Sequence, residues 1–180
     1  AAATKAMQVV LGAIDTGINA INRYRAAIIG LESIAGGRGI NAAAMEEALN
    51  RVTDAFMDVG SASTAFKNLL ARGYDLEQAT NAILRLKDAA AFGRQASLGL
   101  AEAVVSATEG LKNENSILVD NAGVTKNVAK MWEAYAQSIG TTAEKLTQQQ
   151  KVEAEVNGIL EETRYQVGDL AKLQGTLAGT

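Results

Sequence analysis

The chain has 180 residues, of which 48% are hydrophobic and 21% are charged, with a net charge of −3 and no Pro, Cys or His. Without Cys and His it cannot form disulfides or thiolate zinc sites, and it lacks the commonest general base of enzymes. The absence of Pro favours long uninterrupted helices, because Pro breaks them. The near-neutral charge, with no basic stripe, provides no surface for sequence-specific binding of nucleic acid.

The first expected element is an amphipathic helix within residues 6–34, the most apolar stretch of the chain. Asp15, Arg23 and Arg25 interrupt it, so we interpret it as a soluble helix rather than a signal peptide or a membrane span. The alternative is a membrane-active or pore-forming helical protein in which 6–34 inserts into or lies on a bilayer. Its apolar residues follow the spacing of a coiled-coil heptad, at Met7, Leu11, Ile14, Ile18, Ile21 and Ile28.

The second expected element follows a glycine-rich turn at 36–39. The heptad spacing restarts there and continues through Met45, Leu49, Val52, Phe56, Val59, Ser63, Phe66 and Leu70. This pattern predicts one helix over 41–71, ended by Gly73. Residues 1–73 are therefore expected to form a long helical hairpin.

The two heptad faces are candidates for self-association, and packing of the two helices against each other within one chain explains them equally well. The candidate residues are Leu11, Ile14, Ile18, Ile21, Ile28, Leu49, Val52, Phe56, Val59 and Phe66. Aromatic residues make up only 4% of the chain, so close helix packing or self-association has to supply part of the stability.

Residues 74–180 are expected to form a smaller multi-helix region. Capping signatures indicate helix starts at Asp75 with Gln78, Thr125, Thr141 with Glu144, and Thr147 with Gln150. The helix from Thr125 is expected to stop at Gly140, and the last helix to run from Thr147 towards Gly175. No sustained alternating pattern of strands occurs, so the predicted fold class is all-α, an elongated bundle or set of hairpins.

Searches for a chemical site give negative expectations. Residues 37–42 match a relaxed dinucleotide-binding pattern, but a helix rather than a strand precedes them, so a helix–helix connection is the better interpretation. The carboxylate pairs point in different directions on a helix and are expected on solvated faces: Glu46 with Glu47, Glu153 with Glu155, and Glu161 with Glu162. We therefore expect no catalytic residues, no cofactor and no metal, and we expect that the protein is not an enzyme. Trp132 and Tyr135 share a helix face, either as core or as a recognition patch.

An ordered series of short motifs runs through residues 94–173. These motifs are Thr108-Glu109-Gly110-Leu111, Asn115-Ser116, Leu118-Val119-Asp120-Asn121-Ala122-Gly123-Val124, Tyr135-Ala136, Ile139-Gly140, Leu146-Thr147-Gln148-Gln149-Gln150-Lys151 and Ala154-Glu155-Val156-Asn157-Gly158-Ile159-Leu160. Their order and spacing together resemble the recurrent helical segment of bacteriophage tail tape measure proteins. That family more often has Leu and Ile where this chain has Ala122 and Val124.

The resemblance implies a structural segment of a phage tail tape measure protein. Such proteins are long helical chains that set the length of the tail tube during assembly and leave its lumen during DNA ejection. The implied partners are further copies of the chain, as a homo-oligomer such as a trimer, the tail tube and tail assembly chaperone proteins, and a membrane contacted during ejection. The implied location is the tube lumen of the virion, after assembly in the host cytoplasm. A chain that starts without Met is expected to be a processed product or a piece of a longer protein.

Overall fold

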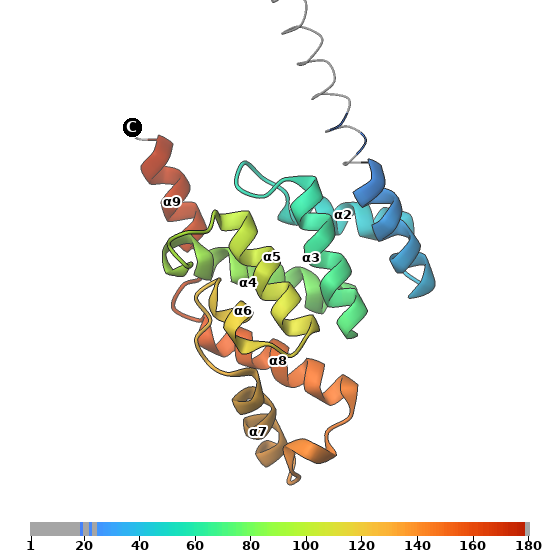
Figure 1. The fold of residues 1–180 in the computed structure, drawn as a ribbon, viewed down its shortest axis with the longest axis vertical. Helices are drawn as coiled ribbons and strands as arrows, with labels where there is room; N and C mark the ends of the chain where they lie inside the picture. The colour runs from blue at the N-terminus through green and yellow to red at the C-terminus, as the bar shows by residue number, and fades with distance from the viewer. Residues whose placement is uncertain (1–18, 20–21, 23–24, 179–180) are drawn as a thin grey trace, which may run out of the picture.

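The computed structural model describes residues 19, 22 and 25–178, and within them the fold is all-α, as the sequence predicts (Figure 1). After a helical stretch at 25–37, the elements are α2 (Ala42–Val52), α3 (Val59–Arg72), α4 (Leu76–Gly93), α5 (Leu100–Lys112), α6 (Ser116–Asp120), α7 (Val128–Ser138), the 3₁₀ helix η1 (Ala143–Lys145), α8 (Gln148–Glu162) and α9 (Asp169–Ala178). α5 packs against α3, α4 and α6, α7 pairs with α8 at one end, and α9 lies against α4. In the part of the chain that is described, no helix has the length and apolar character needed to cross a membrane.

The buried core is aliphatic and rich in alanine. It extends from Leu31 to Ile159 and so crosses the expected boundary between residues 1–73 and 74–180. Many buried positions on α3, α4 and α5 are alanines, including Ala62, Ala65, Ala79, Ala82, Ala103 and Ala107. Small side chains let these helices approach closely, and close packing compensates for the shortage of large aromatic residues.

The single helix predicted over 41–71 is wrong, because the chain leaves helical geometry between α2 and α3, at residues 53–58. The Asp54 carboxylate makes a local turn there. Its Oδ1 accepts hydrogen bonds from the backbone N–H groups of Phe56 at 2.8 Å and Met57 at 3.0 Å. Asp side chains compete with helical backbone bonding in this way, which the heptad pattern does not reveal.

Two further contacts hold the bend between α2 and α3. Asp58 caps α3, because its Oδ1 accepts from the backbone N–H of Ser61 at 2.7 Å. From α4, the buried Lys87 donates to the backbone oxygen of Val52 and to Oδ2 of Asp54, both at 2.6 Å. The ammonium group thus binds the last carbonyl of α2, where a cation is favourable.

The continuous last helix predicted from Thr147 is also wrong, because α8 ends at Glu162 and a separate α9 follows. Gly168, which directly precedes α9, has a positive φ of 87°, a conformation that glycine adopts at little steric cost. Asp88 on α4 then fixes the start of α9, since its two carboxylate oxygens accept from the N–H groups of Gly168 and Leu170, each at 3.1 Å.

Some of the predicted helix ends are confirmed. The capping boxes of Asp75 with Gln78 and of Thr147 with Gln150 are both formed, and they begin α4 and α8. Gly73 ends α3 with a φ of 114°.

Two predicted caps are not formed as expected. Thr125 does not cap the helix that follows it, because Asn127 caps α7 by accepting from Ala129 N–H at 2.8 Å. Thr141 precedes only the short η1, which contains Glu144 and has no side-chain cap.

The glycine-rich turn is a helix–helix connection, as predicted. The chain is helical up to residue 37, turns at 38–39, and enters α2 after Asn41, whose side chain accepts from Ala44 N–H at 2.7 Å. The Arg38 side chain crosses to the end of α3, where it donates to the backbone oxygen of Leu70 and, at 3.2 Å, to that of Tyr74. Arg38 therefore connects the turn between the helical stretch 25–37 and α2 to the C-terminus of α3.

Candidate functional site

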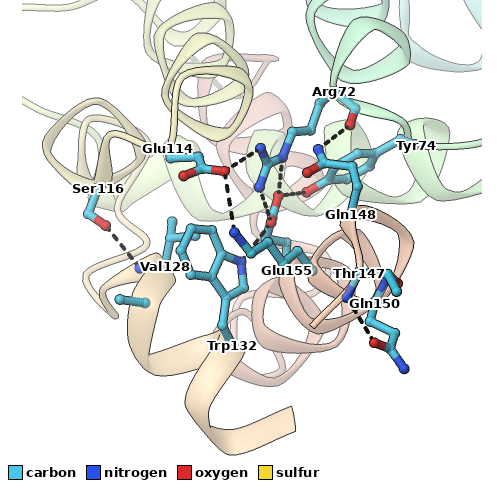
Figure 2. A network of polar contacts seen from close by, with 12 residues as sticks. Arg72, Tyr74, Glu114, Ser116, Val128, Trp132, Thr147, Gln148, Gln150 and Glu155 are labelled. Carbon is cyan, nitrogen blue, oxygen red and sulfur yellow. Dashed lines mark hydrogen bonds and ion pairs between the residues drawn. The ribbon is translucent and has the colours of Figure 1, made fainter. Parts of the chain in front are cut away.

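A buried carboxylate is the centre of the most developed polar cluster in the described residues (Figure 2). Glu155, on α8, has no exposed surface. It accepts hydrogen bonds from Arg72 Nε at 3.3 Å and Nη2 at 2.9 Å, from Tyr74 OH at 3.1 Å and from Trp132 Nε1 at 2.8 Å. We call the following residues the Glu155 cluster: Arg72, Tyr74, Glu114, Trp132, Gln148, Lys151 and Glu155.

Local structure explains how α8 contributes three members of this cluster. The capping box at Thr147 fixes the first turn of the helix. Gln148, Lys151 and Glu155 are spaced by three and four positions, so they lie along one face. Gln148 Nε2 donates to the backbone oxygen of Arg72 at 2.9 Å. This hydrogen bond satisfies a carbonyl at the C-terminal end of α3, which has no partner within the helix.

The cluster contains two positive and two negative groups. Arg72 Nη1 donates to Glu114 at 2.8 Å, and Lys151 Nζ lies 3.9 Å from the same carboxylate oxygen. Lys151 Nζ also lies 4.5 Å from the centre of the Trp132 ring, a cation–π distance. The arginine and glutamate charges are therefore paired where they are buried, which offsets the cost of removing them from water.

The surroundings fix the protonation states of the cluster. Burial, and next the negative charge of Glu155, raise the pKa of Tyr74 well above its ordinary value, so the phenol stays neutral and donates. Burial alone would lower the pKa of Arg72, but its hydrogen bonds to Glu155 and Glu114 raise it above the ordinary value. The hydrogen bond from Arg72 lowers the pKa of Glu114. Arg72 and Glu114 are therefore both charged throughout the neutral range.

Stability is expected to fall at alkaline pH because of Tyr74. The pKa of Tyr74 is higher in the folded than in the unfolded chain, so its contribution is complete below about pH 10 and is lost as the pH rises. Urea unfolding at pH 8 and pH values above 10 should show a smaller alkaline loss for Tyr74→Phe than for the original chain. Tyr165→Phe, at a tyrosine 78% exposed, is the matched control and should keep the original pH dependence. An unchanged alkaline loss in Tyr74→Phe would contradict the assignment.

The geometry of the cluster is that of a structural junction. Glu155 is enclosed and receives its donors from α3, from the turn after α3 and from α7 (Figure 2). Arg72 and Glu155 are 83 positions apart in the sequence. A hydrogen-bonded buried ion pair of this kind specifies one arrangement of the elements that supply it, because any other leaves a charge unpaired. The cluster thus fixes α7 and α8 against the end of α3.

The expectation that the carboxylate pairs lie on solvated faces is wrong for Glu155. Glu153 is exposed as expected, whereas Glu155 is fully buried. A signal was present in the sequence: Val152, Glu155 and Ile159 are spaced by three and four, which places the carboxylate on the apolar stripe of α8. Trp132 is half-buried and packs against the core while it donates to Glu155.

The candidate self-association residues fall into three groups. Leu49, Val52 and Phe66 are buried in the core of their own chain. Ile28 and Phe56 are partly buried against that core, and Val59 is partly exposed. The remaining four lie outside the described residues: Leu11, Ile14, Ile18 and Ile21. Where they are described, most of the heptad positions thus contribute to packing within one chain.

A cleft of about 990 Å³ lies between the bend at 53–58, the first turns of α3, and α5, and four carboxylates line it. Three already have partners: Asp54 pairs with Lys87, Asp58 caps α3, and Glu102 accepts from Gly99 N–H at 3.3 Å. In residues 25–178 no three His, Cys, Asp or Glu side chains are grouped to hold a metal ion. Comparisons of the chain with protein families, curated proteins and solved structures find no match.

Proposed function

We propose that the chain is a structural segment of a phage tail tape measure protein, which sets tube length during assembly and leaves the tube during DNA ejection. The resemblance of residues 94–173 is the basis of this proposal, and the all-α fold is compatible with it. Its main structural support is that several residues of the resembling motifs lie at contacts between helices or at helix caps.

Two glycines of the motifs lie where backbone segments touch. A Cβ on Gly110 of α5 would lie 2.6 Å from the backbone oxygen of Asn115 and 2.8 Å from the backbone nitrogen of Val119. Gly123 has a positive φ of 94°, and a Cβ there would lie 2.9 Å from the backbone oxygen of Gly93. Both positions therefore require glycine for the packing of α5, α6 and the end of α4.

Other residues of the motifs also make specific contacts between helices or cap a helix. A Cβ on Gly158 of α8 would meet the Met131 side chain of α7 at 2.5 Å. Asn115 caps α6, and the Ser116 hydroxyl accepts from the N–H of Val128 at 2.9 Å. Proteins that share these residues in this order would share the packing of α5 to α8, so the resemblance is better explained by a common fold than by common composition.

The folded bundle suggests how such a segment takes part in length control. α4, with 18 residues, spans about 27 Å, so no long rod is formed by that helix. In the proposal, the bundle is one folded unit of a longer chain, and tube length follows the total amount of chain in the lumen. The Glu155 cluster then keeps this unit in one arrangement during assembly.

The proposal predicts that the chain is present in mature virions and is lost from them on DNA ejection. Peptides of residues 25–178 should be found by mass spectrometry in purified particles of the phage that encodes the chain. After ejection is triggered, they should disappear from the tails while the tail tube subunit, as internal control, stays. Particles that never contain the chain, or emptied tails that retain it, would contradict the proposal.

A further inference from the structure

The bend between α2 and α3 interrupts a sequence that is suited to a continuous helix. The heptad spacing passes through it without a change of phase, at Met45, Leu49, Val52, Phe56, Val59, Ser63, Phe66 and Leu70. Residues 53–58 contain neither Gly nor Pro, and they include Ala55 and Met57, which favour helices. Residues 41–71 can therefore form one helix of about 46 Å once the bend is released.

A small set of contacts holds the bend. Locally these are the turn made by Asp54, the backbone hydrogen bonds that Asp54 and Met57 exchange, the burial of Met57 and the cap made by Asp58. From α4 there is the ammonium group of Lys87. In a continuous helix the backbone oxygen of Val52 accepts from the N–H of Phe56 instead, which is the ordinary helical bond. Straightening thus replaces the bond from Lys87 to Val52 by a helical one.

Straightening also removes α2 from its own bundle. Met45, Leu49 and Val52 of α2 are 2%, 7% and 0% exposed in the bent chain. When α2 continues the axis of α3, these three side chains become exposed to solvent. The surface of α4 against which α2 packed becomes exposed as well. A second copy carries the same two surfaces, so each copy can cover those of the other.

We propose that two copies of this chain exchange residues 25–52 by straightening residues 53–58. The exchanged segment carries Arg38, which then binds the carbonyl oxygens at the end of α3 in the second copy, as it does within one chain. Except at the bend, the contacts of α2 are re-formed between chains. The inference goes beyond the proposed function and does not depend on it, because it concerns the isolated chain in solution.

Lys87 opposes the exchange. Its side chain is 2% exposed, and in the bent chain it is bound to Val52 and Asp54. In the exchanged form both acceptors have joined a helix, so the ammonium group is left buried without them, which is costly. Replacing Lys87 by Met removes this cost from the dimer and removes a contact from the monomer, so both effects favour the exchange.

The first test is the oligomeric state, measured by light scattering after size-exclusion chromatography. The double variant Asp54→Ala with Asp58→Ala removes the local turn and the α3 cap, and it should raise the dimer association constant by roughly tenfold or more. Lys87→Met should act in the same direction. Asp75→Ala removes a similar cap at α4, away from the bend, and should leave the association constant unchanged. Ala55→Gly, at an exposed position, disfavours the helix and should lower it.

The second test is the path of the chain in the dimer. The protein has no Cys, so cysteines placed at Glu47 of α2 and Glu77 of α4, which are exposed and line one groove, can be joined selectively by a short bis-maleimide. The cross-link should connect two cysteines of one chain in the monomer and cysteines of different chains in the dimer. Folded variants that stay monomeric, or dimers with joins only within chains, overturn the proposal. If the Asp54/Asp58 variant does not fold, the original chain refolded at high concentration decides: dimers joined between chains support exchange, and monomers alone overturn it.

Discussion

Replacing Glu155 by Gln should lower the free energy of unfolding by about 3 kcal/mol. The variant keeps the size of the side chain but removes its charge, so Arg72, itself 6% exposed, loses the main partner for its Nε and Nη2 groups. Gln also brings an N–H₂ group into a site whose neighbours are all donors. Thermal unfolding should show a fall in Tm of roughly 6 to 12 °C.

The matched control for this variant is Glu153→Gln on the same helix. Glu153 is exposed, and its replacement should change the free energy of unfolding by less than about 0.5 kcal/mol. The double variant Arg72→Met with Glu155→Gln should lose less than the sum of the two single variants, because no charge is then left unpaired. Equal stabilities of Glu155→Gln and Glu153→Gln would show that the cluster does not hold the fold together.

Replacing Gly110 by Ala should cost about 3 kcal/mol. The new Cβ would lie 2.6 Å from the backbone oxygen of Asn115 and 2.8 Å from the backbone nitrogen of Val119. Both are main-chain atoms, so they cannot rotate away, and α6 has to move off α5. Urea unfolding followed by circular dichroism measures the loss.

Gly36 provides the control for Gly110→Ala. It lies in the helical stretch 25–37, and a Cβ there meets nothing within 4 Å. Gly36→Ala should therefore leave stability unchanged or raise it by about 0.5 to 1 kcal/mol, since Ala favours the helix. A Gly110→Ala variant as stable as Gly36→Ala would mean that α5 and α6 are not packed as closely as the structure has them.

Features that depend on neighbouring residues were predictable from the sequence. The capping boxes at Asp75 and Thr147 need only residues three positions apart, and the end of α3 at Gly73 follows from the conformational freedom of one residue. The all-α class follows from periodicity summed over long stretches. In these cases the local preference and the fold agree.

The bend at 53–58 was not predictable from periodicity, because the heptad pattern is the same in a bent and in a straight chain. The bend is held by the local hydrogen bonds of Asp54 and Asp58 together with a tertiary contact from Lys87, more than thirty positions away in the sequence. The Glu155 cluster likewise depends on contacts between residues that are far apart in the sequence. Its spacing on α8 could have indicated a buried position, but the identity of its partners, Arg72 and Tyr74, depends on which helices meet.

The proposed role in length control is tested most directly by tail length. Under the proposed function a phage encodes the chain within a longer gene, and an in-frame duplication of these 180 residues in that gene adds chain without removing any contact described above. Electron microscopy of the particles should then show longer tails, by up to about 270 Å, the length of the added residues as one α-helix. Tails of unchanged length, in particles that contain the lengthened chain, would contradict the proposed function.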